Sequence, residues 1–210
     1  MKTDVKHIPE HDVTTITYSY DELSPAAQEK VKNWYLDSID LYDFVEYWEF
    51  EQQYLYGIHG LNIQFSLGYC QGDGVNVYGE LCFDDLKELL KSVKLDNFTE
   101  KEWKRIEFYF YQCCYSISIP KNNTHYSYDY SRNIDFANDW IGQLEYYGIR
   151  DIDENLIYKL EEVVKKAFNI VNTEMEEIGY DFFYEIPDDF VDYCNANGWE
   201  FLEDGTLYKG

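Results

Sequence analysis

Between residues 34 and 56 the apolar side chains recur three, four and seven positions apart, which is the spacing of one face of an α-helix. In a helix over residues 43–56, the face opposite the apolar one carries Asp43, Glu46 and Glu49. Gly57 follows as a residue that can end the helix in the left-handed conformation. The pattern predicts a helix with a core face and a carboxylate face. The apolar positions are Trp34, Leu36, Leu41, Phe44, Val45, Trp48 and Leu55.

Capping residues mark where other helices begin. Ser24 precedes Pro25 and can accept hydrogen bonds from the first turn of a helix. Thr99 and Glu102 have the spacing of a capping box, and Asp153 can cap a long helix. Together with the apolar spacing, these signals predict helices over residues 25–37, 84–93, 99–105, 154–178 and 188–195, and a short one within 135–148.

Alternation of apolar and polar residues predicts strands that pair as hairpins. Leu61–Tyr69 alternates in this way, and Gln71–Gly74 supplies a turn into a partner strand, Val75–Leu81. Glu107–Ile119 is rich in aromatic and branched side chains, which favours a strand that turns back into Thr124–Tyr130. Shorter strands are predicted over Val13–Tyr18, Trp199–Leu202 and Thr206–Tyr208.

Hairpins with helices set between them indicate an α+β fold, in which an antiparallel sheet built from hairpins is covered by helices on one side. The 210 residues can bury a sizeable core, and no linker rich in Pro, Ser or Gly divides them. We therefore predict one acidic α+β domain over residues 1–210, with residues 1–12 flexible.

The charge is strongly negative and unevenly distributed. The chain has 17 Lys and Arg against 41 Asp and Glu, a net charge of −24. Two stretches, Asn33–Leu86 and Ala167–Tyr208, contain no Lys or Arg at all but carry many acids. Such a charge destabilises the fold through self-repulsion, so it serves either solubility or a basic partner. It argues against direct binding to the phosphates of a nucleic acid.

Cysteine usage and hydropathy indicate the compartment. The 5 cysteines are odd in number and form no C-x-x-C pair, which is typical of reduced thiols. No apolar leader follows Met1, and no apolar run is long enough to cross a membrane. We therefore expect a cytoplasmic protein that contacts no membrane; its oligomeric state stays open.

Several motifs resemble, in their order, a family of small proteins encoded by phages and prophages. The hallmark of that family is a W-S-Q-G-D-G-A block. Here Tyr69, Cys70 and Val75 replace its Trp, Ser and Ala, and the Q-G-D-G core is kept. Members are sometimes labelled antitoxin-like, so the resemblance implies a phage setting but no catalytic residues. The matching segments are Leu23–Ala27, Trp34–Tyr35, Phe50–Glu51, Gly57–Ile58, Gly68–Val75, Glu174–Tyr180, Asn195–Asn197 and Glu203–Gly205.

Metal chemistry is not favoured by the sequence. His7 and His11 have the spacing of two zinc ligands on one helical face, but Pro9 lies between them and no helical pattern surrounds them. Asp73 lies between two glycines and is explained as a turn residue, because the other carboxylates of a calcium loop are missing. We predict no metal and no cofactor.

Enzymatic motifs are absent as well. No Ser or Cys stands in the context of an activated nucleophile, and no phosphate-binding glycine loop occurs. Cys113 and Cys114 fall in the predicted strand, where buried structural thiols are the simpler interpretation. We therefore predict a binding protein, while a small metal-dependent hydrolase using acids near Gln71–Gly74 stays an alternative.

The remaining signal is the arrangement of carboxylates. Acids three or four residues apart on a helix have Cβ atoms about 5–6 Å from each other, so a row of them can imitate a phosphate backbone. Our leading hypothesis is an acidic inhibitor that occupies the nucleic-acid channel of a bacterial host protein, such as a CRISPR effector or restriction enzyme. The alternative is an antitoxin-like partner that caps a protein through tyrosine and apolar side chains. The predicted contact residues are Asp37, Asp40, Asp43, Glu46 and Glu49 in one row, Glu174, Glu177, Asp181, Asp188, Asp189 and Asp192 in another, and Gln71 and Asp73 in the loop.

Overall fold

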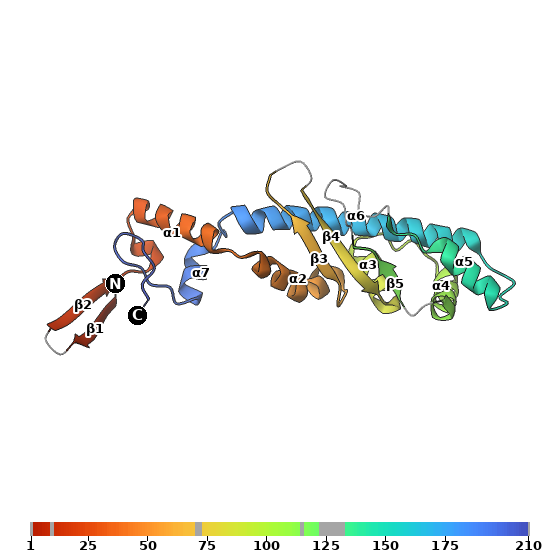
Figure 1. Ribbon diagram of the computed structural model, residues 1–210, viewed down its shortest axis with the longest axis horizontal. Coiled ribbons are helices and arrows are strands. Elements are labelled where there is room, and N and C mark those ends of the chain that lie inside the picture. Colours follow the sequence, from red (N-terminus) through yellow and green to blue (C-terminus); the bar gives the residue numbers. More distant parts are fainter. Residues whose placement is uncertain (1, 9–10, 70–72, 114–115, 122–132, 210) are drawn as a thin grey trace. The chain divides into compact units, whose positions relative to one another are not determined.

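Figure 1 presents the protein as a computed structural model, which describes residues 2–8, 11–69, 73–113, 116–121 and 133–209. The chain forms two compact units. Unit 1 combines residues 1–40 with residues 180–210, and unit 2 contains residues 41–179. No helix in the described part is long and apolar enough to cross a membrane.

Unit 2 contains most of the secondary structure. Three antiparallel strands in the order β3-β4-β5 form its sheet, with Ile63 opposite Val77 and Gly79 opposite Ile119. The strands are β3 (Asn62–Ser66), β4 (Gly74–Leu81) and β5 (Ile117–Ile119). The helices are α2 (Leu41–Tyr56), α3 (Phe83–Ser92), α4 (Glu100–Cys113), α5 (Ala137–Tyr146) and α6 (Glu154–Tyr184), whose last turns belong to unit 1.

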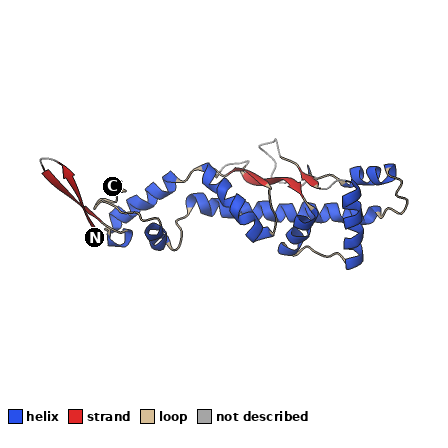
Figure 2. Ribbon diagram, turned by 90° about the horizontal axis from the view of Figure 1, so that it is seen from below, coloured by secondary structure: helices blue, strands red, loops and turns tan. Residues whose placement is uncertain are grey.

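The sheet of unit 2 lies against α6, as Figures 1 and 2 show. Asn172 of α6 is buried, and its side-chain oxygen accepts a hydrogen bond of 2.9 Å from the backbone N–H of Val77 in β4. This bond satisfies a strand N–H beyond the end of the short strand β5, where a buried unsatisfied donor would be costly. The long helix therefore supports the sheet through a hydrogen bond as well as through apolar packing.

The apolar face predicted for the long helix is confirmed. Leu156, Leu160, Val163, Val164, Ala167, Val171 and Met175 are all buried. On α2, Phe44 and Trp48 are fully buried, and Trp48 Nε1 donates a hydrogen bond of 2.7 Å to the carbonyl oxygen of Leu61. Gln52 bonds both the N–H and the carbonyl oxygen of Leu61, so α2 is fixed to the start of β3.

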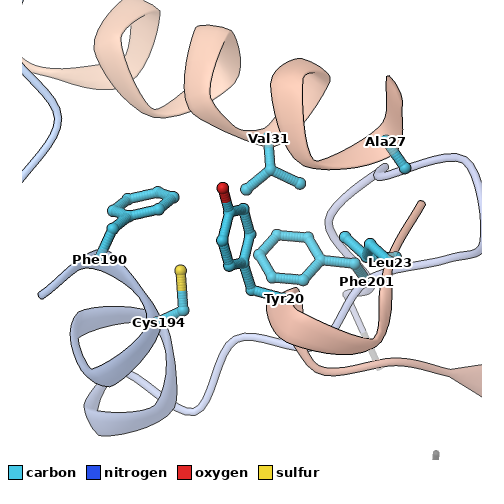
Figure 3. Close-up of a cluster of buried hydrophobic side chains, with 7 residues drawn as sticks. All are labelled: Tyr20, Leu23, Ala27, Val31, Phe190, Cys194 and Phe201. Atoms are coloured by element: carbon cyan, nitrogen blue, oxygen red, sulfur yellow. The ribbon is translucent and has the colours of Figure 1, made fainter. Parts of the chain in front are cut away.

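Unit 1 has a small aromatic core. It contains β1 (Lys2–Ile8), β2 (His11–Thr17), the 3-10 turn η1 (Tyr20–Glu22), α1 (Pro25–Ser38) and α7 (Phe190–Ala196). Figure 3 shows Phe190 and Cys194 of α7 pointing toward Tyr20, whose ring lies 5.0 Å from that of Phe190. Phe201 forms β-bridges with Tyr18 and with Leu207. Segments from the two ends of the sequence thus share one core.

The predicted fold class is confirmed: the fold is α+β, with an antiparallel sheet and covering helices. The capping bonds confirm two of the predicted helix starts: Ala27 N donates to Ser24 Oγ at 3.3 Å, and Leu156 N donates to Asp153 Oδ1 at 3.2 Å. The predicted end of α2 is confirmed as well, because Gly57 has a left-handed φ of +69°. The long helix extends six residues beyond the predicted end, to Tyr184.

The prediction of a strand over Glu107–Ile119 is wrong for most of its length. Helix α4 continues to Cys113, and only Ile117–Ile119 forms a strand, which pairs with β4. Trp103, Ile106 and Phe110 recur three and four residues apart and are buried, so the helical period prevailed over the β-favouring composition. Cys113 accordingly ends a helix, where its thiol lies 3.6 Å from the carbonyl oxygen of Trp140. Cys114 and the predicted strand Thr124–Tyr130 lie outside the described residues.

At the N-terminus, Lys2–Ile8 pairs with His11–Thr17 in an antiparallel register, and the flexibility expected of residues 1–12 stays a prediction. One further expectation differs from the structure. Leu41 was expected in the core, but it is 65 % exposed at the first turn of α2. The prediction of one domain over the whole chain stays a prediction beside the two compact units.

Candidate protein-binding surface

The charges of unit 2 are segregated along its length. Its described ion pairs to Lys or Arg all involve α3, α4 or the first half of α6. By contrast, α2 and residues 167–179 of α6 contain no Lys or Arg. We call these two segments together the acidic end. Its acidic residues are Asp43, Glu46, Glu49, Glu51, Glu174, Glu176 and Glu177.

The two helices of the acidic end are in direct contact. The Tyr56 hydroxyl of α2 donates a hydrogen bond of 2.9 Å to Glu174 Oε2 of α6. Burial, and then the neighbouring Glu174 carboxylate, raise the pKa of Tyr56 well above its ordinary value, so the hydroxyl stays a donor. Gly179 of α6 lies against the side chains of Phe44 and Leu67, which allows this close approach.

Five of the seven carboxylates of the acidic end are exposed, and those of Glu51 and Glu176 are half-buried. Asp43, Glu46 and Glu49 are exposed on α2, on the side opposite Phe44 and Trp48, as the sequence predicted. Glu174 and Glu177 are exposed on α6. Within the described residues, Glu46, Glu49 and Glu177 enter no ion pair with Lys, Arg or His. The described Lys, Arg and His side chains therefore do not neutralise these three carboxylates.

Large aromatic side chains share the exposed face of α2. Phe50 is 79 % exposed and Tyr54 is 85 % exposed, and Tyr42 is also exposed. Phe50 is not among the contact residues predicted from the sequence. Its exposure could have been predicted, because Phe50 follows Asp43 by seven residues and so points in nearly the same direction on a helix.

The other predicted contact residues belong to unit 1. Asp37 and Asp40 are exposed at the end of α1, and Asp188, Asp189 and Asp192 are exposed around the start of α7. Asp181 is exposed in the last turn of α6. Each predicted row of acids is therefore divided between the two units. The structure describes as one surface only those members of a row that belong to the same unit.

Asp73 differs from the other predicted contact residues because its side chain is only 3 % exposed. Its carboxylate accepts hydrogen bonds from Gly68 N at 2.8 Å and from Ser66 Oγ at 3.2 Å. These bonds give Asp73 a structural role in the connection from β3 to β4. Burial, followed by the charges of Asp73 and Glu177, raises the pKa of the nearby Glu176 carboxyl. Gln71 lies outside the described residues.

Metal-ligating and nucleophilic side chains do not gather in the described part of the chain, where no three His, Cys, Asp or Glu residues could hold one metal ion. His7 and His11 fall in paired strands and not on one helical face. His59 Nδ1 lies 3.0 Å from Asp85 Oδ1. Burial raises the pKa of the Cys194 thiol to about 11, which keeps it protonated and poorly nucleophilic at neutral pH.

Comparisons with known proteins give no relative: no protein-family model matches the chain, and no curated protein or solved structure is significantly similar to it. The acidic end, with its aromatic face on α2, is therefore the best candidate for a functional surface.

Proposed function

We propose that the protein binds the basic, nucleic-acid-binding surface of another protein and competes there with the nucleic acid. The observation that supports this proposal is the acidic end, where exposed carboxylates lie on two helical segments, α2 and residues 167–179 of α6, that contain no Lys or Arg. The resemblance of the Gln71–Gly74 block to a phage-encoded family suggests the target: a bacterial defence enzyme, such as a CRISPR effector or a restriction enzyme.

The charge arrangement fits such a partner for two physical reasons. Unneutralised charge of one sign attracts a partner of the opposite sign over distances up to about 10 Å at 0.1 M salt, and so accelerates association. Carboxylates three residues apart, as in Asp43, Glu46 and Glu49 on α2, present charge at intervals of about 5–6 Å. A cleft lined by Lys and Arg can bind such a series in place of phosphates.

A competition experiment with purified nucleic-acid-handling enzymes of bacterial defence tests the proposal. Each enzyme is titrated with the protein in the presence of its labelled DNA or RNA, and displacement of the nucleic acid is measured at increasing NaCl concentration. We expect displacement at low salt and a steep loss of affinity as salt rises, because the contacts are ionic. An affinity that does not change with salt would contradict the proposal.

Neutral variants separate the acidic end from net charge. The triple substitution Glu46→Gln, Glu49→Gln and Glu177→Gln is expected to weaken binding by about tenfold or more, at the level of a few ionic contacts. The control triple, Glu107→Gln, Asp139→Asn and Glu145→Gln, removes the same charge from exposed positions on α4 and α5. Equal losses in the two triples would mean that only the total charge matters.

A second function is supported by the exposed aromatic side chains of α2. An antitoxin-like protein that caps its partner through apolar contacts would use Phe50 and Tyr54 as anchors, because aromatic residues are enriched at the centres of interfaces. That function predicts a complex that survives high salt and is lost on Phe50→Ala. The salt series above therefore distinguishes the two functions.

A further inference from the structure

The exposed face of α2 alternates acidic and aromatic side chains. Glu46, Phe50 and Tyr54 follow one another at intervals of four residues, and Glu49 is three residues from Glu46. Residues three and four apart on a helix are neighbours, so Phe50 lies next to Glu46, and Tyr54 lies next to Phe50 and Glu51. Phe50 and Tyr54 are 79 % and 85 % exposed, although the opposite side of the same helix has filled the core with Phe44 and Trp48. Such an exposed apolar face on a packed helix is typical of an interaction site.

Another part of the protein shows that a ring and a carboxylate can bind one cation together. Phe98, which precedes α4, and Glu102 in the first turn of α4 both contact the ammonium group of Lys159. Lys159 Nζ lies 4.4 Å from the centre of the Phe98 ring and 3.0 Å from Glu102 Oε1. An exposed ring with a carboxylate beside it, as on α2, offers a cation the same two kinds of contact.

We propose that the face formed by Glu46, Glu49, Phe50 and Tyr54 binds an arginine-rich segment of the partner protein. This inference rests on the proposed function and names the chemistry of the partner's contact segment. A guanidinium group is planar, so it stacks on an aromatic ring while its N–H groups donate to a carboxylate in the plane. The side chains of Phe50 and Tyr54 supply the ring faces, and those of Glu46 and Glu49 supply the acceptors.

Other occupants fit this face less well. A second copy of the chain carries the same net charge of −24 and would be repelled, as would a nucleic acid. A purely apolar partner would bury Glu46 and Glu49 without any group to compensate for the lost water. Lysine would satisfy the carboxylates as a point charge, but an ammonium group cannot stack as a guanidinium does.

Short synthetic peptides test the preference for arginine. The probes are two fluorescent peptides of equal length and charge, one alternating arginine with glycine and the other lysine with glycine. Binding to the full chain is measured by fluorescence anisotropy at about 50 mM NaCl, where ionic contacts are weakly screened. We expect the arginine peptide to bind about tenfold more tightly than the lysine peptide, because only arginine gains the stacking contacts.

Ring-removing variants show whether α2 is responsible. Phe50→Leu and Tyr54→Leu together keep an apolar surface but remove the rings, and they should reduce the arginine preference to about twofold or less. Tyr146→Leu is the matched control, since Tyr146 is an equally exposed aromatic residue at the end of α5 and should leave the preference unchanged. Circular dichroism confirms that each variant keeps its helices.

The outcomes separate the inference from the proposed function. If both peptides bind equally and the double leucine variant changes nothing, the arginine site on α2 is overturned while binding to basic surfaces stands. If neither peptide binds the protein, the proposed function itself fails along with the inference. A preference that is lost with Tyr146→Leu instead would also overturn the assignment to α2.

Discussion

Both backbone conformation and packing oppose a side chain at Gly205. It has a φ of +81° and is buried, and a Cβ added there would meet the carbonyl oxygen of Ala27 in α1. Gly198 has a similar φ of +65° with open space around it. We expect Gly198→Ala to cost about 1–2 kcal/mol from backbone strain alone, and Gly205→Ala to cost clearly more because α1 must also move. Urea denaturation followed by tryptophan fluorescence measures both, and equal costs would contradict the packing argument.

Glu176 is expected to make stability depend on pH. Its pKa is raised in the folded protein above the ordinary value of 4.5, first by burial and then by Asp73 and Glu177. Between these two values the folded state binds a proton that the unfolded state has lost, so stability falls as pH rises through this window. Glu176→Gln should therefore raise the melting temperature at pH 7 and give no such gain near pH 4. Glu107→Gln controls for the removal of one charge, and a constant gain at all pH values would exclude this origin.

At the residue scale, a helix cap can be predicted from the sequence when the capping side chain is only a few residues from the N–H that it binds. The caps at Ser24, Thr99 and Asp153 were predicted because each bonds a backbone N–H only three residues away. The N-terminus of α5 is capped instead by the Glu161 carboxylate of α6, which accepts hydrogen bonds of 2.8 and 2.7 Å from the N–H groups of Phe136 and Ala137. No local pattern contains that cap, because it exists only once the two helices pack together.

At the scale of elements, the clearest failure is the strand assigned to Glu107–Ile119. Composition and period disagreed there: aromatic residues favour strands, while buried Trp103, Ile106 and Phe110 have helical spacing. Packing decided in favour of the helix, since Phe110 meets Phe83 and Trp140 with ring centres 5.4 and 5.7 Å apart. The hairpin of β3 and β4 was predicted correctly because its alternation and composition agreed.

Helix α6 carries acids at both ends, and these should have opposite effects on its stability. Glu154 lies in the first turn, where the helix dipole favours negative charge, and Asp181 lies in the last turn, which contains no basic residue. We expect Glu154→Gln to lower the free energy of unfolding by about 0.3–1 kcal/mol and Asp181→Asn to raise it by a similar amount. Both changes are measured by urea denaturation at low ionic strength and should shrink in high salt. Effects of the same sign would mean that net charge dominates over the dipole.

For the whole molecule, a net charge of −24 predicts that salt stabilises the fold. Self-repulsion among acids is screened within about 8 Å at 0.15 M ionic strength, so raising the NaCl concentration should raise the melting temperature. Calorimetry in NaCl, with a neutral sugar at equal osmolarity as the control, measures this effect. A melting temperature that falls with NaCl would show that ion pairs such as Lys159 with Glu102 contribute more than repulsion costs.

The sequence predicted the distribution of charge better than the division of the molecule. Stretches without Lys or Arg remain free of them wherever they fold, so the acidic end could be anticipated from residues 33–86 and 167–208. The two units could not be anticipated, because α6 continues through the boundary near Gly179 without a linker or a break in its pattern. The exposure of Phe50 beside Glu46, by contrast, could be predicted from helix spacing, although composition does not reveal it.

The discontinuous make-up of unit 1 sets an order of events during protein synthesis. Tyr20 and Val31 leave the ribosome early, but their core partners Phe190 and Phe201 are translated only after the whole of unit 2. Unit 2 can therefore fold while the first forty or so residues still lack the second half of their core. In a nascent chain, the aromatic side chains of α1 are accordingly left open to chaperones and proteases until Phe190 and Phe201 have been translated.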